Sequence, residues 1–220
     1  MKISRATIKQ SPYLGIFTQL SENYIVLPKT LEKTKIKEIE DYFEVRAIPT
    51  TISESPLIGV FGKQIGQKMI VSQLITEKET KEIEKQGIEV KVLNTEQAIG
   101  NLFAGNSKKG IISQAINPKI KKDIEEFLGI KLETININQT DLVGSSLVIT
   151  EKGFYVNPDI KETEYKKLEN YLELKGGYGS LNYGDKYVGN CMIANTKAIQ
   201  VGETSTNNEI LRIDEALREE

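Results

Sequence analysis

The chain has 220 residues, of which 39% are hydrophobic and 27% are charged, and its formal net charge of −2 is too small to hold nucleic acid over a whole surface. It contains no histidine, so it lacks the side chain that most often acts as a general base and as a zinc ligand. A single cysteine excludes an internal disulfide and fits a reducing compartment. We therefore expect a cytoplasmic protein. We also expect no membrane span, no metal, no cofactor and no small-molecule substrate.

In chain order, the first predicted element is a strand over residues 2–8, which belongs to no repeat. After it, glycines preceded by two apolar residues recur every 41–45 residues. These are Gly15, Gly59, Gly100, Gly144 and Gly189. Aliphatic residues follow at two fixed distances, twelve and twenty-four residues after each glycine. The first set is Leu27, Val71, Ile112, Val156 and Val201, and the second is Ile39, Ile83, Ile124, Leu168 and Ile213. The glycines and the two sets of aliphatic residues thus form three registers that repeat with the same spacing, which indicates five copies of one unit.

Each unit reads locally as β-β-α-β. We expect the apolar residues around the glycine to form a first strand, followed by a polar turn and a second strand. An amphipathic helix comes next, with a capping box at Thr76 and Glu79 and another at Thr206 and Glu209. In the third unit, Asn117 caps a helix that begins with a proline. A third strand, such as residues 45–48, closes the unit.

The fifth unit ends after its helix and therefore lacks a third strand, which the segment 2–8 can supply. This pairing predicts an α/β fold in which five ββαβ repeats close into a ring without a free sheet edge. We expect a single domain. Its repeats span about 10–52, 53–95, 96–138, 139–183 and 184–220, together with the strand 2–8.

Several motifs resemble those of translation initiation factor 6, the ribosome anti-association factor, in its archaeal form. Ala98-Ile99-Gly100-Asn101 is similar to the family's Ala-Leu-Gly-Asn, and Gly179 to Gly184 resembles its Gly-Thr-x-Asn-x-Gly. The resemblance spans nearly the entire chain. It implies the pentein fold, no enzymatic activity, and a monomer that docks on the large ribosomal subunit. The family's docking site is a ribosomal protein beside the sarcin–ricin loop, where the bound factor blocks the small subunit.

Equivalent positions of a ring of repeats lie on one rim, so we expect the residues next to the glycines to bind the ribosome. Asn101 is the strongest candidate, because the family's Gly-Asn matches there residue for residue. The residues predicted to bind are Ile16, Val60, Asn101, Ser145, Ser146, Tyr187 and Asn190. The alternative is that these residues merely begin the strands.

Three other features of the sequence can each be interpreted in two ways. Cys191 suggests a guanidino-modifying enzyme of the same fold, but such chemistry needs a histidine, so we expect a buried strand residue. The lysines of segment 108–122 can meet rRNA, although a solvated helix face is the favoured interpretation. Segment 176–179 is glycine-rich without the sequence of a phosphate loop, and we expect a bent strand or a turn.

A ring-shaped scaffold for another partner, such as a clamp on duplex DNA, is the remaining alternative. The small net charge and the presence of only four arginines count against it. The sequence therefore favours a ribosome-binding translation factor.

Overall fold

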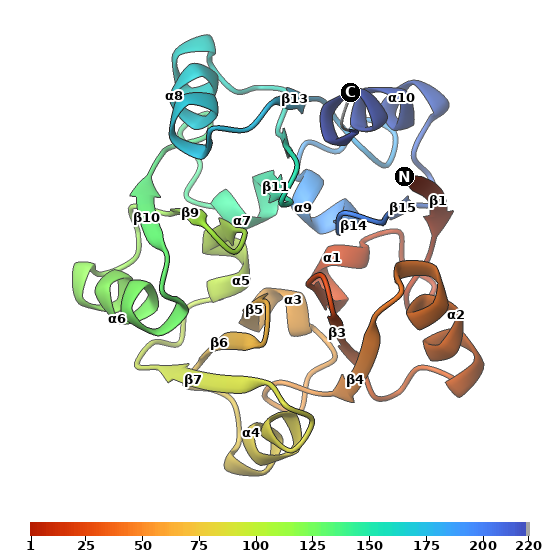
Figure 1. The fold of residues 1–220 in the computed structure, drawn as a ribbon, viewed down its shortest axis with the longest axis vertical. Helices are drawn as coiled ribbons and strands as arrows, with labels where there is room; N and C mark the ends of the chain where they lie inside the picture. The colour runs from red at the N-terminus through yellow and green to blue at the C-terminus, as the bar shows by residue number, and fades with distance from the viewer. Residues whose placement is uncertain (219–220) are drawn as a thin grey trace.

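The computed structural model describes residues 1–218, and in them five three-stranded sheets surround a central axis (Figure 1). The first four sheets follow one another along the chain. They consist of β2 (Gln19–Leu20), β3 (Tyr24–Pro28) and β4 (Arg46–Thr50); β5 (Gly62–Ile65), β6 (Lys68–Ser72) and β7 (Glu89–Leu93); β8 (Phe103–Gly105), β9 (Lys109–Ile112) and β10 (Lys131–Thr134); and β11 (Leu147–Ile149), β12 (Phe154–Val156) and β13 (Gly176–Tyr178). The glycine-rich segment 176–179 thus contains a strand, as one of the two expectations had it.

In each of these sheets the first strand pairs antiparallel with the second, and the second pairs parallel with the third. A parallel pair needs a long crossover, and one helix supplies it in each unit. These helices lie on the outside of the ring: α2 (Lys33–Phe43), α4 (Glu77–Glu84), α6 (Pro118–Leu128), α8 (Glu162–Leu172) and α10 (Asn207–Leu217). Both predicted capping boxes and the Asn117 cap are confirmed.

The fifth sheet joins the two ends of the chain. It contains β14 (Met192–Ala194), β15 (Ala198–Gly202) and β1 (Lys2–Ala6), and β1 pairs parallel with β15 from Lys2 opposite Ala198 to Ala6 opposite Gly202. Arg5 adds a hydrogen bond of 2.7 Å from its Nε to the carbonyl of Ser205. The predicted ring of five repeats, completed by the N-terminal strand, is therefore confirmed. The expected absence of a free sheet edge is wrong, because the five sheets are separate and each keeps its own edge strands. Residues 219–220 of the predicted fifth unit lie outside the described residues.

The prediction of a strand around each glycine is wrong. Each glycine lies in a helix of a single turn, and the first strand of the sheet begins within two residues after that turn. These helices form the innermost ring of Figure 1: α1 (Leu14–Phe17), α3 (Ile58–Phe61), α5 (Ile99–Leu102), α7 (Val143–Ser146) and α9 (Val188–Cys191). Cys191 is buried as expected, but in α9 rather than in a strand. A short apolar run does not distinguish a strand from a buried helical turn.

Close backbone contact explains why glycine occupies these positions. A Cβ atom on Gly59 would overlap the carbonyl oxygen of Gly15, and one on Gly100 would overlap that of Gly59. The same relationship continues through Gly144 and Gly189 and returns from Gly15 to Gly189. Any larger residue would push neighbouring units apart at the axis.

Candidate functional site

The residue after each glycine shares one side of its helical turn with the residue two before the glycine. Backbone hydrogen bonds show this directly, because they join positions three apart, which lie on the same face of a helix. The N–H donates from Val60 to Leu57 (3.1 Å), from Asn101 to Ala98 (2.9 Å) and from Asn190 to Tyr187 (2.9 Å). We call the side of the ring that carries the one-turn helices the glycine face.

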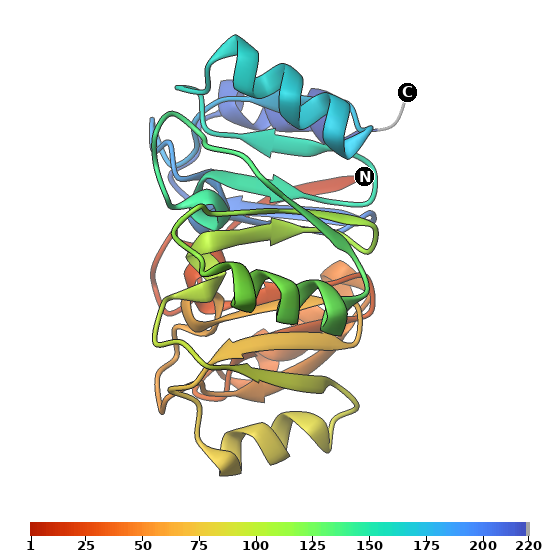
Figure 2. The same cartoon turned by 90° about the vertical axis from the view of Figure 1, so that its left-hand side faces the viewer.

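The glycine face and the hairpin turns lie on opposite sides of the ring. In Figure 2 the strands run across the disc, with the one-turn helices towards the left of the view and the chain termini towards the right. The right side carries the turns between the first and second strands of the sheets, residues 21–23, 66–67, 106–108, 150–153 and 195–197. We call it the hairpin face. A partner that covers one face therefore leaves the other accessible.

The structure divides the predicted binding residues into two groups. Ile16, Val60, Asn101, Tyr187 and Asn190 are half-buried and retain surface. Ser145 and Ser146, in contrast, are 2% and 0% exposed, so their side chains offer a partner almost no surface. Tight packing of α7 against α5 and α9 at the axis buries them.

Three exposed apolar residues near the same helices were not among the predicted binding residues. Tyr13 and Leu142 precede α1 and α7 and are 38% and 37% exposed, and Tyr183, in the turn that leads into α9, is 83% exposed. The signal for Tyr13 and Leu142 was present in the sequence, since both occupy the repeated position two before the glycine. Tyr183 has a positive φ of 64° in a turn that recurs in three other units. None of the three sequence registers runs through this turn, so spacing could not identify Tyr183.

The glycine face has no charge at either repeated position. The residues two before and one after the glycines are uncharged throughout, in a chain in which 27% of residues are charged. The ten residues are Tyr13, Leu57, Ala98, Leu142 and Tyr187, and Ile16, Val60, Asn101, Ser145 and Asn190. Charged residues are depleted and aromatic residues enriched at the centres of protein–protein interfaces. This composition fits contact with a protein better than contact with a phosphate backbone.

Two lysines of the predicted cluster in segment 108–122 have acidic partners within the chain. Lys109 pairs with Glu173 at 2.8 Å and donates to the carbonyl of Tyr171 at 2.8 Å. Lys122 lies 3.6 Å from Glu126 on the solvent side of α6. Because at least these two lysines have partners within the chain, contact of this segment with rRNA stays a prediction.

Cys191 does not have the environment of a nucleophile. Its Sγ lies 3.4 Å from the carbonyl oxygen of Tyr187, and burial raises the pKa of the thiol far above its ordinary value. A reactive cysteine needs the opposite shift and a base to take its proton. Within residues 1–218, no three side chains of His, Cys, Asp or Glu come together as metal ligands. No helix in the same part of the chain is long and apolar enough to cross a bilayer.

Comparison with known proteins decides the family. The family model described as "eIF-6 family" matches residues 3–216. The chain belongs to the eIF-6 family. Translation initiation factor 6 of Pyrococcus horikoshii is 30% identical, with 99% of each chain covered, and that of Saccharolobus islandicus is 31% identical, with 100% of each covered. These relatives are named as translation factors and not as enzymes, which confirms the predicted family.

A solved structure of DDAH from Pseudomonas aeruginosa complexed with citrulline is also similar. It is 10% identical, with 93% of this chain and 74% of that chain covered, and its TM-score is 0.46. A likeness at that level carries no argument about activity. The predicted pentein fold is instead shown by the five-unit ring itself.

Proposed function

We propose that the protein is a translation initiation factor that binds the large ribosomal subunit and sterically prevents it from joining the small subunit too early. Membership of the eIF-6 family is the single observation that carries this proposal. The partner would be a ribosomal protein beside the sarcin–ricin loop, with local contact to rRNA. No chemistry is required, because a rigid ring only has to occupy the surface where the subunits meet.

We infer that the glycine face is the side that docks. Its repeated positions are uncharged, and its exposed aromatic residues supply large apolar contacts of the kind that dominate binding energy. Asn101 lies among them with part of its surface accessible. In a mostly apolar interface, an amide that hydrogen-bonds to the partner gives orientation as well as affinity. Ile16, Val60, Tyr187 and Asn190 would surround it, whereas Ser145 and Ser146 would support the turn from within.

The alternative of a guanidino-modifying enzyme finds no support in this chain. The buried thiol of Cys191 has no histidine to activate it. We expect the factor to act as a monomer.

Subunit joining measured by light scattering or on sucrose gradients tests the mechanism. Saturating protein should reduce the formation of joined ribosomes and should sediment with the large subunit. If joining is unchanged while the protein is bound to the large subunit, the steric mechanism is wrong. If the protein does not sediment with the large subunit at all, the proposed partner is wrong.

Substitution of Asn101 tests the docking face. Asn101→Arg should weaken large-subunit binding at least about tenfold, because a charge without a partner would be buried at the interface. Asn23→Arg is the matched control, since Asn23 is exposed on the hairpin face, and its binding should stay within about twofold. If the control weakens binding and Asn101→Arg does not, the docking face is the other one.

A further inference from the structure

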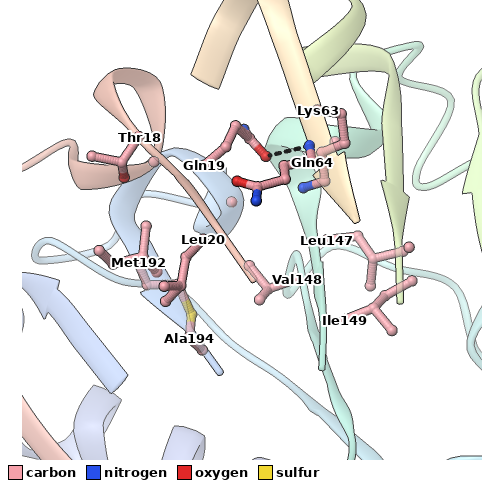
Figure 3. Close-up of a pocket in the computed structure, with 15 residues that line it drawn as sticks. Thr18, Gln19, Leu20, Lys63, Gln64, Leu147, Val148, Ile149, Met192 and Ala194 are labelled. Atoms are coloured by element: carbon pink, nitrogen blue, oxygen red, sulfur yellow. Dashed lines mark hydrogen bonds between the residues drawn. The ribbon is translucent and has the colours of Figure 1, made fainter. Parts of the chain in front are cut away.

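A small cavity of about 60 Å³ lies on the axis of the ring, where the first strands of the sheets come together. Its walls are mainly glycines and apolar side chains, among them Leu20, Leu147 and Met192. Among the described residues that line it, Lys63 is the one with a charged side chain. Figure 3 shows Lys63 and Gln64, two consecutive residues of β5, at this cavity.

The ammonium group of Lys63 has no counter-charge in the described part of the chain. No ion pair and no hydrogen bond joins it to another residue of 1–218. Lys63 as a whole residue is half-buried. Burial of its side chain lowers the pKa of Lys63 to about 8, as expected when a cation loses water without gaining an anion. A cation in this state is stabilised by any small anion that can reach it.

Gln64 supplies a second unsatisfied group, of opposite character. Its side chain is 3% exposed, and its Oε1 is buried without a hydrogen-bond partner in the described residues. Its Nε2 donates to the carbonyl of Gly66 at 2.9 Å and to Ser21 Oγ at 3.2 Å. Because a carbonyl only accepts, this contact fixes the orientation of the amide and leaves Oε1 as an acceptor that needs a donor.

The side chain of Gln19 holds the backbone of Gln64 in place. The N–H of Gln64 donates to Gln19 Oε1 at 3.4 Å, the contact drawn as a dashed line in Figure 3. Gln19 Nε2 in turn donates to the carbonyl of Gly59 at 3.3 Å. The acceptor is therefore fixed at the cavity wall by contacts that reach back to the glycines at the axis.

We propose that this cavity binds a small oxyanion that also carries a hydroxyl group, of which hydrogen phosphate is the simplest example. Lys63 would donate to a charged oxygen, and Gln64 Oε1 would accept from the hydroxyl. The volume of the cavity agrees with this ligand. About 10–15 Å³ of cavity volume holds one water-sized group, so the cavity has room for about four to six such groups. Phosphate has four oxygen atoms.

The site has a route to solvent on the hairpin face. A second cavity of about 330 Å³ lies among the hairpin turns and shares Leu20, Gln64 and Gly105 with the first. Glu22 and Glu151 also line it, and their carboxylates keep their negative charge while they accept hydrogen bonds from Thr196 and Ser107. The ligand would enter from the side opposite the glycine face, so its binding is independent of the proposed docking.

Isothermal titration of the full chain with inorganic phosphate at pH 7 and constant ionic strength tests this proposal. We expect one saturable site, weakened at least about tenfold in Lys63→Met, which keeps the length of the side chain and removes the charge. Lys68→Met is the matched control, because Lys68 on β6 donates to the carbonyl of Phe127 away from the cavity, and its affinity should equal that of the wild type. Sulfate, which has no hydroxyl at this pH, should bind the wild type at least about fivefold more weakly than phosphate.

Three results would overturn the proposal. They are the absence of saturable binding at millimolar phosphate, equal binding of sulfate and phosphate, and equal loss of binding in the Lys63 and Lys68 variants. If Lys63→Met does not fold, the wild type still decides the question. Saturating phosphate must raise the pKa of Lys63, followed by NMR of its Cε, above its value in the free protein, and an unchanged pKa would rule out contact with the anion.

Discussion

Gly15 and Gly189 lie against each other at the axis, although they come from the first and last units of the chain. A Cβ atom on Gly15 would overlap the carbonyl oxygen of Gly189. The contact closes the innermost ring of one-turn helices, while the pairing of β1 with β15 closes the fifth sheet. Residues from both ends of the sequence therefore close the ring twice, once through the one-turn helices and once through the fifth sheet.

Replacing a central glycine should be far more damaging than replacing a glycine in a turn. Gly100→Ala places a methyl group onto the carbonyl oxygens of Gly59 and Gly62, so we expect a loss of about 3 kcal/mol or more in the free energy of unfolding. Gly66→Ala is the control: its φ is +59°, but nothing lies within 4 Å of the added Cβ, and about 1 kcal/mol is expected. Urea denaturation measures both, and similar losses would show that close approach is not the reason for glycine at the axis.

We infer from the closed ring that the chain unfolds as one domain. Each unit packs against two neighbours, and the fifth sheet requires both ends of the chain, so loss of one unit exposes the apolar surface of the next. Far-ultraviolet circular dichroism and tyrosine fluorescence should therefore give coincident urea transitions. Two separate transitions would contradict this inference.

The carboxylate of Glu79 should make stability depend on pH. Burial pushes the pKa of Glu79 up, but hydrogen bonds from the Thr51 hydroxyl and from the amides of Thr76 and Glu54 outweigh burial and hold it below the ordinary value. A lowered folded-state pKa gives stability that is present above the unfolded-state value of about 4.5 and is lost as the pH falls through the folded-state value.

Glu79→Gln should accordingly cost about 1–3 kcal/mol at pH 7. The difference from the wild type should shrink as the pH falls below about 4.5. Glu77→Gln, on the exposed side of the same helix, is the control and should cost less than about 0.5 kcal/mol. Denaturation at several pH values measures these differences. A Glu79→Gln difference that stays constant down to pH 3 would exclude the carboxylate as its source.

Removing the Tyr183 ring should weaken binding of the large subunit without changing thermal stability. Asparagine tolerates the positive φ of 64° at this position, so Tyr183→Asn removes an exposed aromatic contact while keeping the backbone. We expect about a fivefold or larger loss of affinity. Sedimentation with the large subunit measures affinity, and a lowered Tm at unchanged affinity would instead assign the ring a structural role.

Cys191 should be unreactive in the folded protein. Burial raises the pKa of its thiol, so almost no thiolate is available at pH 8 to attack a disulfide reagent. We expect no labelling under native conditions and one labelled thiol per chain in denaturant. Rapid labelling of the folded protein would show that the thiol is accessible. It would then favour the alternative of a guanidino-modifying enzyme.

The repeat, the long helices with their caps and the completion of the fifth sheet by the N-terminal strand could all be predicted from the sequence. The repeat and the helices depend on local spacing or on a cap whose partners lie within three residues, as with Thr76 and Glu79. The completion of the fifth sheet follows from counting elements, because the last unit lacks a third strand and the segment 2–8 belongs to no unit. The family, too, could be recognised from motifs such as that around Asn101. The regular spacing of the repeated residues is enough for these conclusions, because every unit has the same local pattern.

The tertiary structure alone decided what happens where the five units meet. It turned the predicted strands around the glycines into one-turn helices, buried Ser145 and Ser146, exposed Tyr183, and left Lys63 beside a cavity with no counter-charge in the described residues. These outcomes arise from contacts between residues more than 40 positions apart, such as Gly15 and Gly59. Local periodicity carries no information about such contacts, because they exist only once the ring has closed.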